Sequence, residues 1–127
     1  MNPAAHKRPF PRCRRIRSSA DFDATFARGR RVSGNDALLV VKRNESAITR
    51  LGISVGRKFG NSPQRNRAKR LLREAFRLER PTLPEGFDLV VVPRRPGFPD
   101  SLVAVRAMLR RLVERGTGQK PKDTADA

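Results

Sequence analysis

The chain has 127 residues, of which 29 are Lys or Arg and 12 are Asp or Glu, so its formal charge is +17. That length predicts one domain, and the charge favours a polyanionic partner, because self-repulsion otherwise opposes compaction. The lone Cys13 excludes an internal disulfide, no Cys/His cluster has metal-site spacing, and no apolar run approaches the roughly 18 residues of a membrane helix. We therefore expect a soluble cytoplasmic protein without a membrane partner.

The two ends of the chain differ in composition from its middle. Residues 1–15 contain three prolines and a basic cluster, which predicts an extended arm that is either a solvated tail or a direct RNA contact. Residues 116–127 contain Gly, Lys, Pro and Asp with almost no apolar residues, and we expect them to be disordered. The predicted domain therefore spans residues 16–115.

The first helix is predicted directly after the arm. Ser18 or Ser19 can cap its N-terminus, and Gly29 can end it. Phe22 and Phe26 are spaced i,i+4 and therefore share one face of this helix. A Phe pair at this spacing is more often part of a core than an exposed platform, so the residues alone favour a structural role.

Apolar runs predict three strands and a final helix. Ala37–Val41 has the length of a buried strand, and Leu51–Val55 alternates apolar with small residues in a second strand, which we expect to pair antiparallel with the first. Phe87–Val92 is the third strand. The last helix begins after a cap at Asp100 or Ser101. Its apolar stripe contains Leu102, Val105, Met108, Leu109, Leu112 and Val113.

The most distinctive stretch, Gly56–Arg77, places a Gly-containing basic loop directly before a helix. Asn61 or Ser62 can cap this helix, and Pro63 suits its first turn. Its apolar positions follow a helical repeat: Ala68, Leu71, Leu72, Ala75 and Phe76. The remaining sides are polar and strongly basic, with Glu74 as the single acid before Arg77, and they carry Arg65, Asn66, Arg67, Lys69, Arg70, Arg73 and Arg77.

The order is helix, strand, strand, an optional further strand, helix, strand, helix. Because a strand lies on each side of the basic helix, the chain is expected to cross over within one sheet. This order predicts a two-layer α/β (α+β) sandwich with a small mixed sheet of three or four strands.

The basic helix allows several interpretations. A merely solvated helix would gain from mixed charges, whereas Arg73 and Arg77, and likewise Arg65 and Lys69, are like charges at i,i+4. A membrane-surface or calmodulin-type helix needs a larger apolar face than this one can spare. A DNA-reading helix-turn-helix is disfavoured because a strand precedes the helix. RNA fits best, since a basic helix on an α/β platform suits backbone and shape recognition.

The residues of this stretch resemble those of the bacterial ribonuclease P protein component. Arg65-Asn66-Arg67 opens the basic helix after the loop Arg57–Asn61, and Ala68–Arg77 continues the likeness. Further similarity lies in Asp21-Phe22, Phe26, Gly29 and Phe87–Val91. The resemblance covers about residues 14–114 in family order, and its central motif is highly specific.

The resemblance implies a fold similar to the second domain of ribosomal protein S5 and a role in a ribonucleoprotein that removes the 5′ leader from precursor tRNA. It implies that the RNA subunit hydrolyses the substrate with Mg²⁺ held mainly by RNA, so this chain would carry no catalytic side chain, no metal site and no organic cofactor. The implied partners are the catalytic RNA and precursor tRNA, without an obligate protein partner. The residues agree, because no nucleophile–base pair or paired carboxylates are recognisable.

The resemblance also implies two contact surfaces. The surface for the RNA subunit would contain Arg57, Lys58, Arg65, Asn66, Arg67, Lys69, Arg70, Arg73 and Arg77. The surface for the leader would lie between the first helix and the sheet and would contain Phe22, Phe26, Arg30, Arg31 and Val40. Family members often carry aromatic residues on the first long strand, but residues 37–41 have none, so apolar contact is expected to replace stacking there.

Two other functions are compatible with parts of the sequence. A ribosomal or general RNA-binding protein of similar fold would bind RNA without accelerating precursor tRNA cleavage. A protein-only nuclease would need an acidic metal cluster, whereas the acids here are scattered, and Asp88 has no obvious carboxylate partner in the sequence.

Overall fold

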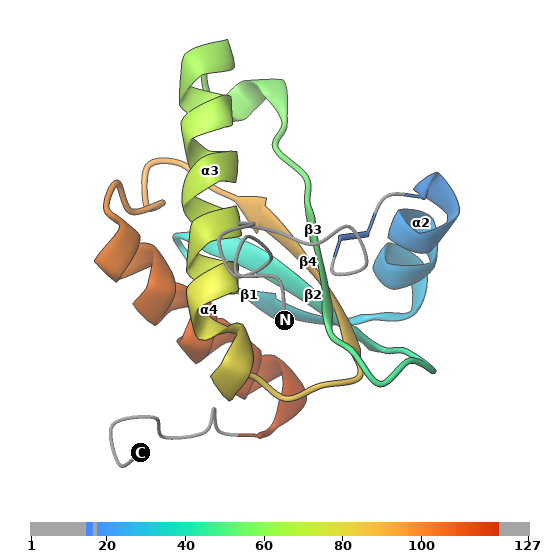
Figure 1. Cartoon of the computed structure of the whole chain (residues 1–127). Coiled ribbons are helices and arrows are strands. Elements are labelled where there is room, and N and C mark those ends of the chain that lie inside the picture. The colour runs from blue at the N-terminus through green and yellow to red at the C-terminus, as the bar shows by residue number, and fades with distance from the viewer. Residues whose placement is uncertain (1–14, 17, 120–127) are drawn as a thin grey trace, which may run out of the picture.

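The computed structural model describes residues 15, 16 and 18–119 (Figure 1). The elements along the chain are α2 (Ser19–Arg28), β1 (Arg30–Ser33), β2 (Ala37–Arg43), β3 (Arg50–Ile53), the 3-10 turn η2 (Arg57–Phe59), α3 (Ser62–Glu79), the 3-10 turn η3 (Arg80–Thr82), β4 (Phe87–Pro93) and α4 (Leu102–Thr117). The predicted α/β class and number of elements are confirmed, but the additional strand, β1, precedes the two strands predicted before α3 and does not follow them. No described helix is long and apolar enough to cross a membrane.

The four strands form one mixed sheet in the order β1-β2-β4-β3. Strand β2 is antiparallel to both β1 and β4, and β3 runs parallel to β4 after the crossover through α3. The prediction that β2 and β3 pair antiparallel is therefore wrong. Pairing of β2 with β4 extends as far as Arg43 opposite Phe87, and the Asn44 amide donates to the Gly86 carbonyl, so β4 occupies the edge that a β2–β3 hairpin would need.

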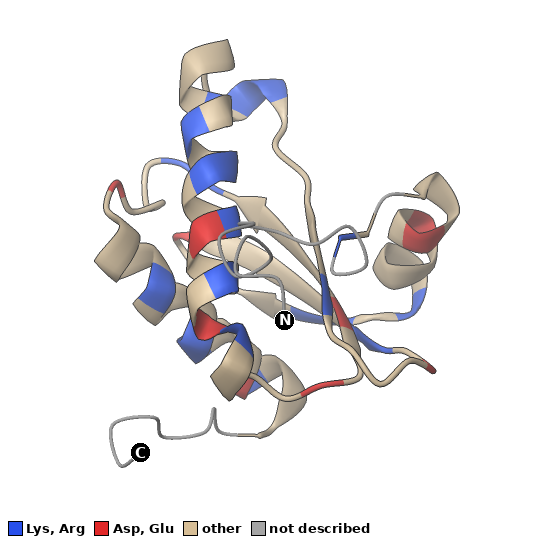
Figure 2. Cartoon of the chain, viewed as in Figure 1, with Lys and Arg blue, Asp and Glu red and all other residues tan. Residues whose placement is uncertain are grey.

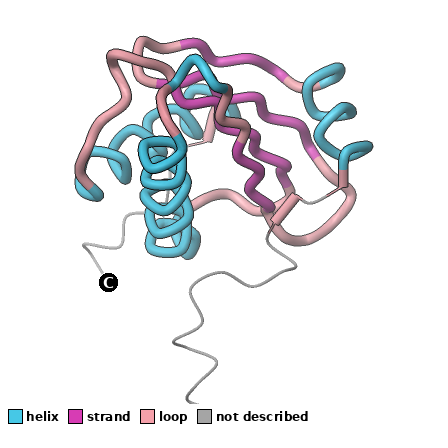
Figure 3. Tube along the Cα trace, turned by 90° about the horizontal axis from the view of Figure 1, so that it is seen from above, coloured by secondary structure: helices cyan, strands magenta, loops and turns pink. Residues whose placement is uncertain are grey.

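Helices cover both faces of the sheet. Helices α3 and α4 pack together on one face, and α2 crosses the other, as the two views in Figures 1 and 3 show. Because side chains alternate along a strand, β2 and β4 supply residues to both faces. The larger core lies under α3 and α4 and includes Leu39, Val41, Leu89 and Val91 of the sheet with Leu72, Phe76, Leu109 and Leu112 of the helices.

A smaller apolar cluster attaches α2 to the opposite face. Ile16, Val40 and Val90 are buried in it, and Phe22 and Phe26 pack against it half-buried. A Cβ atom at Gly52 of β3 would lie 2.8 Å from Cζ of Phe22 and 3.2 Å from Cβ of Ile16. The absence of a side chain at Gly52 therefore lets the Phe22 ring approach the backbone of β3.

The N-terminus of α3 is fixed by a capping box. Oδ1 of Asn61 accepts from the Gln64 amide at 3.0 Å, and Oε1 of Gln64 accepts from the Asn61 amide at 2.8 Å. This satisfies two backbone donors that would otherwise lack a partner. Ser18 caps α2 and Ser101 caps α4, so each cap is one of the two residues predicted for it.

The C-terminal boundary differs from its prediction. Helix α4 continues to Thr117. Gly116 is buried so close to Val41 that a Cβ atom at this position would lie 2.6 Å from a Val41 methyl group. The domain therefore extends two residues beyond the expected end at residue 115. Residues 1–14 and 120–127 lie outside the described residues, so the predicted arm and disordered tail stay predictions there.

Candidate nucleic-acid interface

Helix α3 presents a polar stripe to solvent along its length. At about 100° per residue, Asn66, Arg70, Arg73 and Arg77 fall within an arc of about 60°, and we call these four residues the basic ridge. Asn66, Arg70 and Arg73 are exposed, whereas Arg77 is half-buried. Figure 2 shows Lys and Arg recurring along α3 and in the turn before it. The apolar stripe packs on the sheet and so holds the ridge outward.

The charges of the ridge are only partly compensated. Arg77 forms a two-pronged ion pair with Glu74, with Nε–Oε1 and Nη2–Oε2 distances of 2.8 and 2.6 Å, and its hydrogen bonds lower the pKa of Glu74. Within the described part of the chain, no carboxylate pairs with Arg70 or Arg73. Arg57 and Lys58, exposed on η2, also lack an ion-pair partner among the described residues. These uncompensated cations match the repeating charge of a phosphate backbone.

The two arginines beside Asn66 have structural partners that the sequence did not reveal. Arg65 donates from Nη1 to the Gly60 carbonyl at 2.7 Å and from Nη2 to Oγ of Ser62 at 3.0 Å. Arg67 donates from Nε to Oδ1 of Asp100 at 2.6 Å and from Nη2 to the Asp100 carbonyl at 3.0 Å. Both residues thus brace the loops that flank α3. Lys69 is half-buried on the same flank as Arg65.

A hollow of about 250 Å³ lies between α2, β3 and α3. We call it the α2 hollow, and its lining consists of Arg15, Ile16, Phe22, Leu51, Gly52, Ile53 and Arg73. Arg73 belongs to both the basic ridge and this hollow, so the two surfaces are continuous. The sequence predicts Arg73 on the RNA-subunit surface alone and Arg15 in the N-terminal arm, whereas Arg15 lies beside Leu51 in a short parallel bridge.

The other predicted leader residues divide between the two faces of the sheet. Arg31 stands opposite Val40 in the β1–β2 register, on the α2 face, and its guanidinium carbon lies 5.9 Å from the Phe26 ring centre. Arg30 stands opposite Val41 and so belongs to the face that carries α3 and α4. Val40 has no exposed surface. The predictions that Arg30 and Val40 contact a leader beside the Phe residues are therefore wrong, because strand alternation and burial remove them from that surface.

Asp88 is the central acceptor of a buried polar network and is 3% exposed. Arg50 donates to both of its carboxylate oxygens, at 2.9 and 2.7 Å, and Nδ2 of Asn44 donates to Oδ1 at 2.9 Å. Arg50 also reaches Oδ2 of Asp21 on α2 at 3.3 Å. The network therefore ties β3, β4 and α2 together. Among the described residues, no group of three or more His, Cys, Asp or Glu could hold a metal ion.

This network predicts a stability that depends on pH. Burial opposes ionisation of Asp88, but the hydrogen bonds from Arg50 and Asn44 outweigh it, so the pKa of Asp88 is lowered. The unfolded chain, with a carboxyl pKa of about 3.9, takes up this proton first as the pH falls. The stabilisation is therefore complete above about pH 5 and is lost as the pH falls through the folded pKa.

Urea unfolding at a series of pH values between neutrality and pH 3 measures this dependence. We expect Asp88→Asn to flatten the acid limb of the stability curve, whereas Glu45→Gln, at an exposed turn residue, should leave it unchanged. Equal slopes for Asp88→Asn and the parent chain would contradict the assignment.

Comparison with known proteins identifies a family that this chain resembles. The family model described as Ribonuclease P matches residues 10–116. The ribonuclease P protein component of Clostridium kluyveri is 37% identical over 103 residues, which cover 80% of this chain and 92% of that protein. The ribonuclease P protein component of Thermotoga maritima is 40% identical over 86 residues, covering 68% of this chain and 74% of that protein.

Solved structures show the same arrangement of elements. The RNase P protein from Thermotoga maritima superposes with a TM-score of 0.73 at 35% identity, covering 80% of this chain and 96% of that one. The RNase P protein from Staphylococcus aureus superposes with a TM-score of 0.73 at 26% identity, covering 91% and 98% of the two chains.

Proposed function

This chain belongs to the ribonuclease P protein family, and we propose that it binds the catalytic RNA of ribonuclease P through α3 and the 5′ leader of precursor tRNA at the α2 hollow. In this role it enables removal of the leader to generate mature tRNA 5′ ends. The observation that carries the proposal is the continuity, through Arg73, of a basic ridge whose charges are only partly compensated with a hollow lined by the Phe22 ring.

The ridge supports the RNA-subunit contact by its charge and its rigidity. Arg70 and Arg73 project from a capped 18-residue helix whose other side is buried, so little ordering is needed on binding. Each phosphate that such a cation neutralises releases counterions, which makes assembly depend steeply on salt. Arg57 and Lys58 on η2 extend the same surface beyond the start of α3.

The α2 hollow supports the leader contact by its chemistry. The half-buried ring of Phe22 lines it beside Ile53, while Arg73 supplies a positive charge at its edge. An aromatic ring next to a cation suits a single strand, whose bases stack without sequence preference while its phosphates are neutralised. Arg31 and Phe26 extend this surface along α2 and β1.

Hydrolysis belongs to the RNA subunit in this proposal. The acidic side chains nearest the interface already accept hydrogen bonds from arginines. Asp88 and Asp21 accept from Arg50, and Glu74 accepts from Arg77. A divalent ion prefers several carboxylate or phosphate oxygens together, and RNA phosphates offer them. We therefore assign Mg²⁺ mainly to the RNA, and assign to this chain the binding of RNA and substrate in the cytoplasm.

Single-turnover cleavage of a precursor tRNA at low Mg²⁺ tests this function. The reaction is run with the cognate RNA subunit, with this chain, and with both. We expect cleavage with both components and none with the chain alone, because the protein offsets phosphate repulsion that Mg²⁺ would otherwise screen. Tight RNA binding without any gain in rate would instead indicate a general RNA-binding protein.

The leader contact predicts a selective effect of Phe22→Leu. Leucine keeps apolar volume against Gly52 and Val40 but removes the stacking ring. Since stacking contributes roughly 1–3 kcal/mol per base, we expect precursor tRNA with a long leader to bind the holoenzyme roughly fivefold or more weakly. Affinity for a substrate with a minimal leader should not change. Equal losses for both substrates, measured by equilibrium binding, would show that Phe22 acts through folding or assembly.

A further inference from the structure

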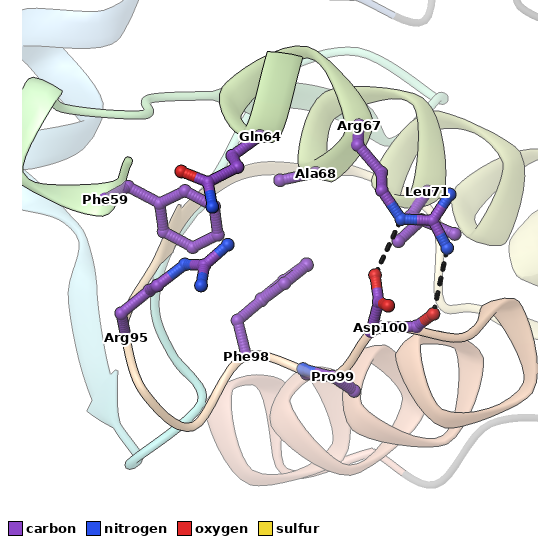
Figure 4. A pocket seen from close by; sticks show the side chains of 9 residues that line it. All are labelled: Phe59, Gln64, Arg67, Ala68, Leu71, Arg95, Phe98, Pro99 and Asp100. Carbon is purple, nitrogen blue, oxygen red and sulfur yellow. Dashed lines mark hydrogen bonds and ion pairs between the residues drawn. The ribbon is translucent and has the colours of Figure 1, made fainter. Parts of the chain in front are cut away.

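A second pocket, of about 350 Å³, lies on the flank of α3 away from α2 (Figure 4). It is enclosed by the first half of α3 on one side and by residues 95–100, which lead into α4, on the other. Its volume is near the lower end of the range of about 300–1,000 Å³ typical of small-molecule sites. A compact ring system is the size of ligand that it suits.

The walls of this pocket are aromatic and aliphatic. Phe59 and Phe98 meet edge-to-face, with ring centres 5.6 Å apart and planes at 79°. Phe59 is buried, but Phe98 is only partly buried, and Ala68 and Leu71 of α3 complete the apolar lining. Figure 4 shows the Phe98 ring pointing into the space between the two walls. A flat ring could therefore contact an aromatic face here.

Polar groups of both hydrogen-bonding types surround the apolar walls. The capping box engages Oε1 of Gln64, which leaves the amide nitrogen pointing toward the pocket in Figure 4. Arg67 donates to Oδ1 of Asp100 and to its carbonyl, so Oδ2 of Asp100 is left as an acceptor by these bonds. Donors and an acceptor around a flat apolar slot match the edge of a nucleobase, which presents both.

The charge around the mouth selects for an anionic chain. The Arg95 guanidinium lies 4.8 Å from the Phe59 ring centre, and Arg57 and Lys58 are exposed immediately before Phe59. These cations disfavour a cationic ligand and favour a base linked to phosphates. Arg57 and Lys58 also belong to the surface proposed above for the RNA subunit, whereas the α2 hollow lies on the other flank of α3.

We propose that this pocket receives one unstacked nucleobase of the RNA subunit, with Phe98 contacting its ring and Gln64 and Asp100 contacting its edge. This rests on the proposed function, which supplies the RNA as partner. The base would add recognition of sequence, since contacts to phosphates position a protein on its nucleic acid but carry no sequence information. We favour the RNA subunit over the leader as the occupant because the α2 hollow, proposed above for the leader, lies on the opposite flank of α3.

The first test is an NMR titration of the ¹⁵N-labelled full chain with adenosine 5′-monophosphate. We expect saturable shifts of the Gln64 side-chain amide and of the Phe98 backbone amide, and no comparable shifts there with ribose 5-phosphate, which lacks the base. Identical shifts with both compounds, or shifts spread evenly over the basic surface, would overturn the proposal. This titration contains no RNA subunit, so its outcome is independent of the cleavage assay.

The second test measures assembly of two variants with the RNA subunit. Phe98→Leu removes the ring, and Gln64→Glu replaces the amide donor while still able to complete the capping box. We expect each to weaken binding of the RNA subunit by roughly fivefold or more, with the leader-length dependence of substrate binding unchanged. Arg115→Ala, at an exposed position in the last turn of α4, is the matched control.

Two results would overturn the proposal. If the variants lower thermal stability but bind the RNA subunit as the parent does, the pocket only holds residues 95–100 against α3. If they change the leader-length dependence instead of assembly, the leader and not the RNA subunit occupies the pocket.

Discussion

Arg70→Glu is expected to weaken assembly with the RNA subunit by about 10- to 100-fold, because a charge-assisted contact of about 1.5–3 kcal/mol is replaced by repulsion. Arg70 is exposed at the centre of the basic ridge and pairs with no carboxylate among the described residues, so its removal costs no intrachain bond that the structure shows. Thermal stability should stay the same or rise slightly, since like charges along α3 repel less.

The milder Arg70→Ala variant isolates the electrostatic component. If Arg70 neutralises one phosphate, the slope of log K against log salt should fall by about one unit. Arg115→Ala is the matched control, since it removes an exposed arginine in the last turn of α4 without touching α3. Titration of labelled RNA subunit at several salt concentrations gives both slopes. An unchanged slope for Arg70→Ala, or an equal fall for Arg115→Ala, would remove Arg70 from the interface.

Asp88→Ala is expected to lower the free energy of unfolding by about 2–3 kcal/mol, since removing one partner of a buried ion pair leaves the other uncompensated. Breaking a fully buried ion pair costs about 3–5 kcal/mol. We expect a smaller loss here, because a quarter of the Arg50 side chain reaches solvent and Asp21 remains as a second partner. The loss should loosen α2, since Arg50 links Asp88 to this helix.

Urea unfolding of Asp88→Ala beside Glu45→Ala separates this effect from simple loss of an acid. Glu45 is exposed in the turn after β2, and its removal should change stability by no more than about 0.5 kcal/mol. The folded fraction is held equal in the cleavage assays. The Asp88→Ala protein alone should not cleave precursor tRNA, and its complex with the RNA subunit should cleave at nearly the parent rate. Loss of the chemical step with folding retained would revive a protein-borne nuclease site.

Features that depend on neighbours in the sequence were predictable. The cap at Asn61, the apolar stripe of α3 and the stripe of α4 all follow from spacings of three and four residues. The basic ridge follows from the same periodicity, because residues on the side opposite a buried stripe must face solvent. The family motif is also contiguous in the sequence, so the family resemblance could be identified without the structure.

Features that depend on distant pairing were not predictable. The position of β4 between β2 and β3 depends on pairs of residues 38 or more positions apart, such as Val40 with Val90 and Gly52 with Val90. Five consecutive apolar residues in β2 gave no sign of which side chains α2 would cover, so the complete burial of Val40 was not predicted. The partners of Arg67 and Arg50, namely Asp100 and Asp88, lie 33 and 38 residues away. Spacing could not indicate that these arginines brace the fold.

The division of labour between α3 and the α2 hollow is the central claim, and one crossed measurement tests it. Binding of the RNA subunit, and binding of precursor tRNA with long and minimal leaders, are measured for Arg70→Ala and Phe22→Leu in the same reconstituted complex. We predict that Arg70→Ala weakens assembly and leaves the leader-length dependence unchanged. Phe22→Leu should leave assembly unchanged and reduce the leader-length dependence of substrate binding. If both variants change the two quantities in the same proportion, the two surfaces do not act separately and the account is contradicted.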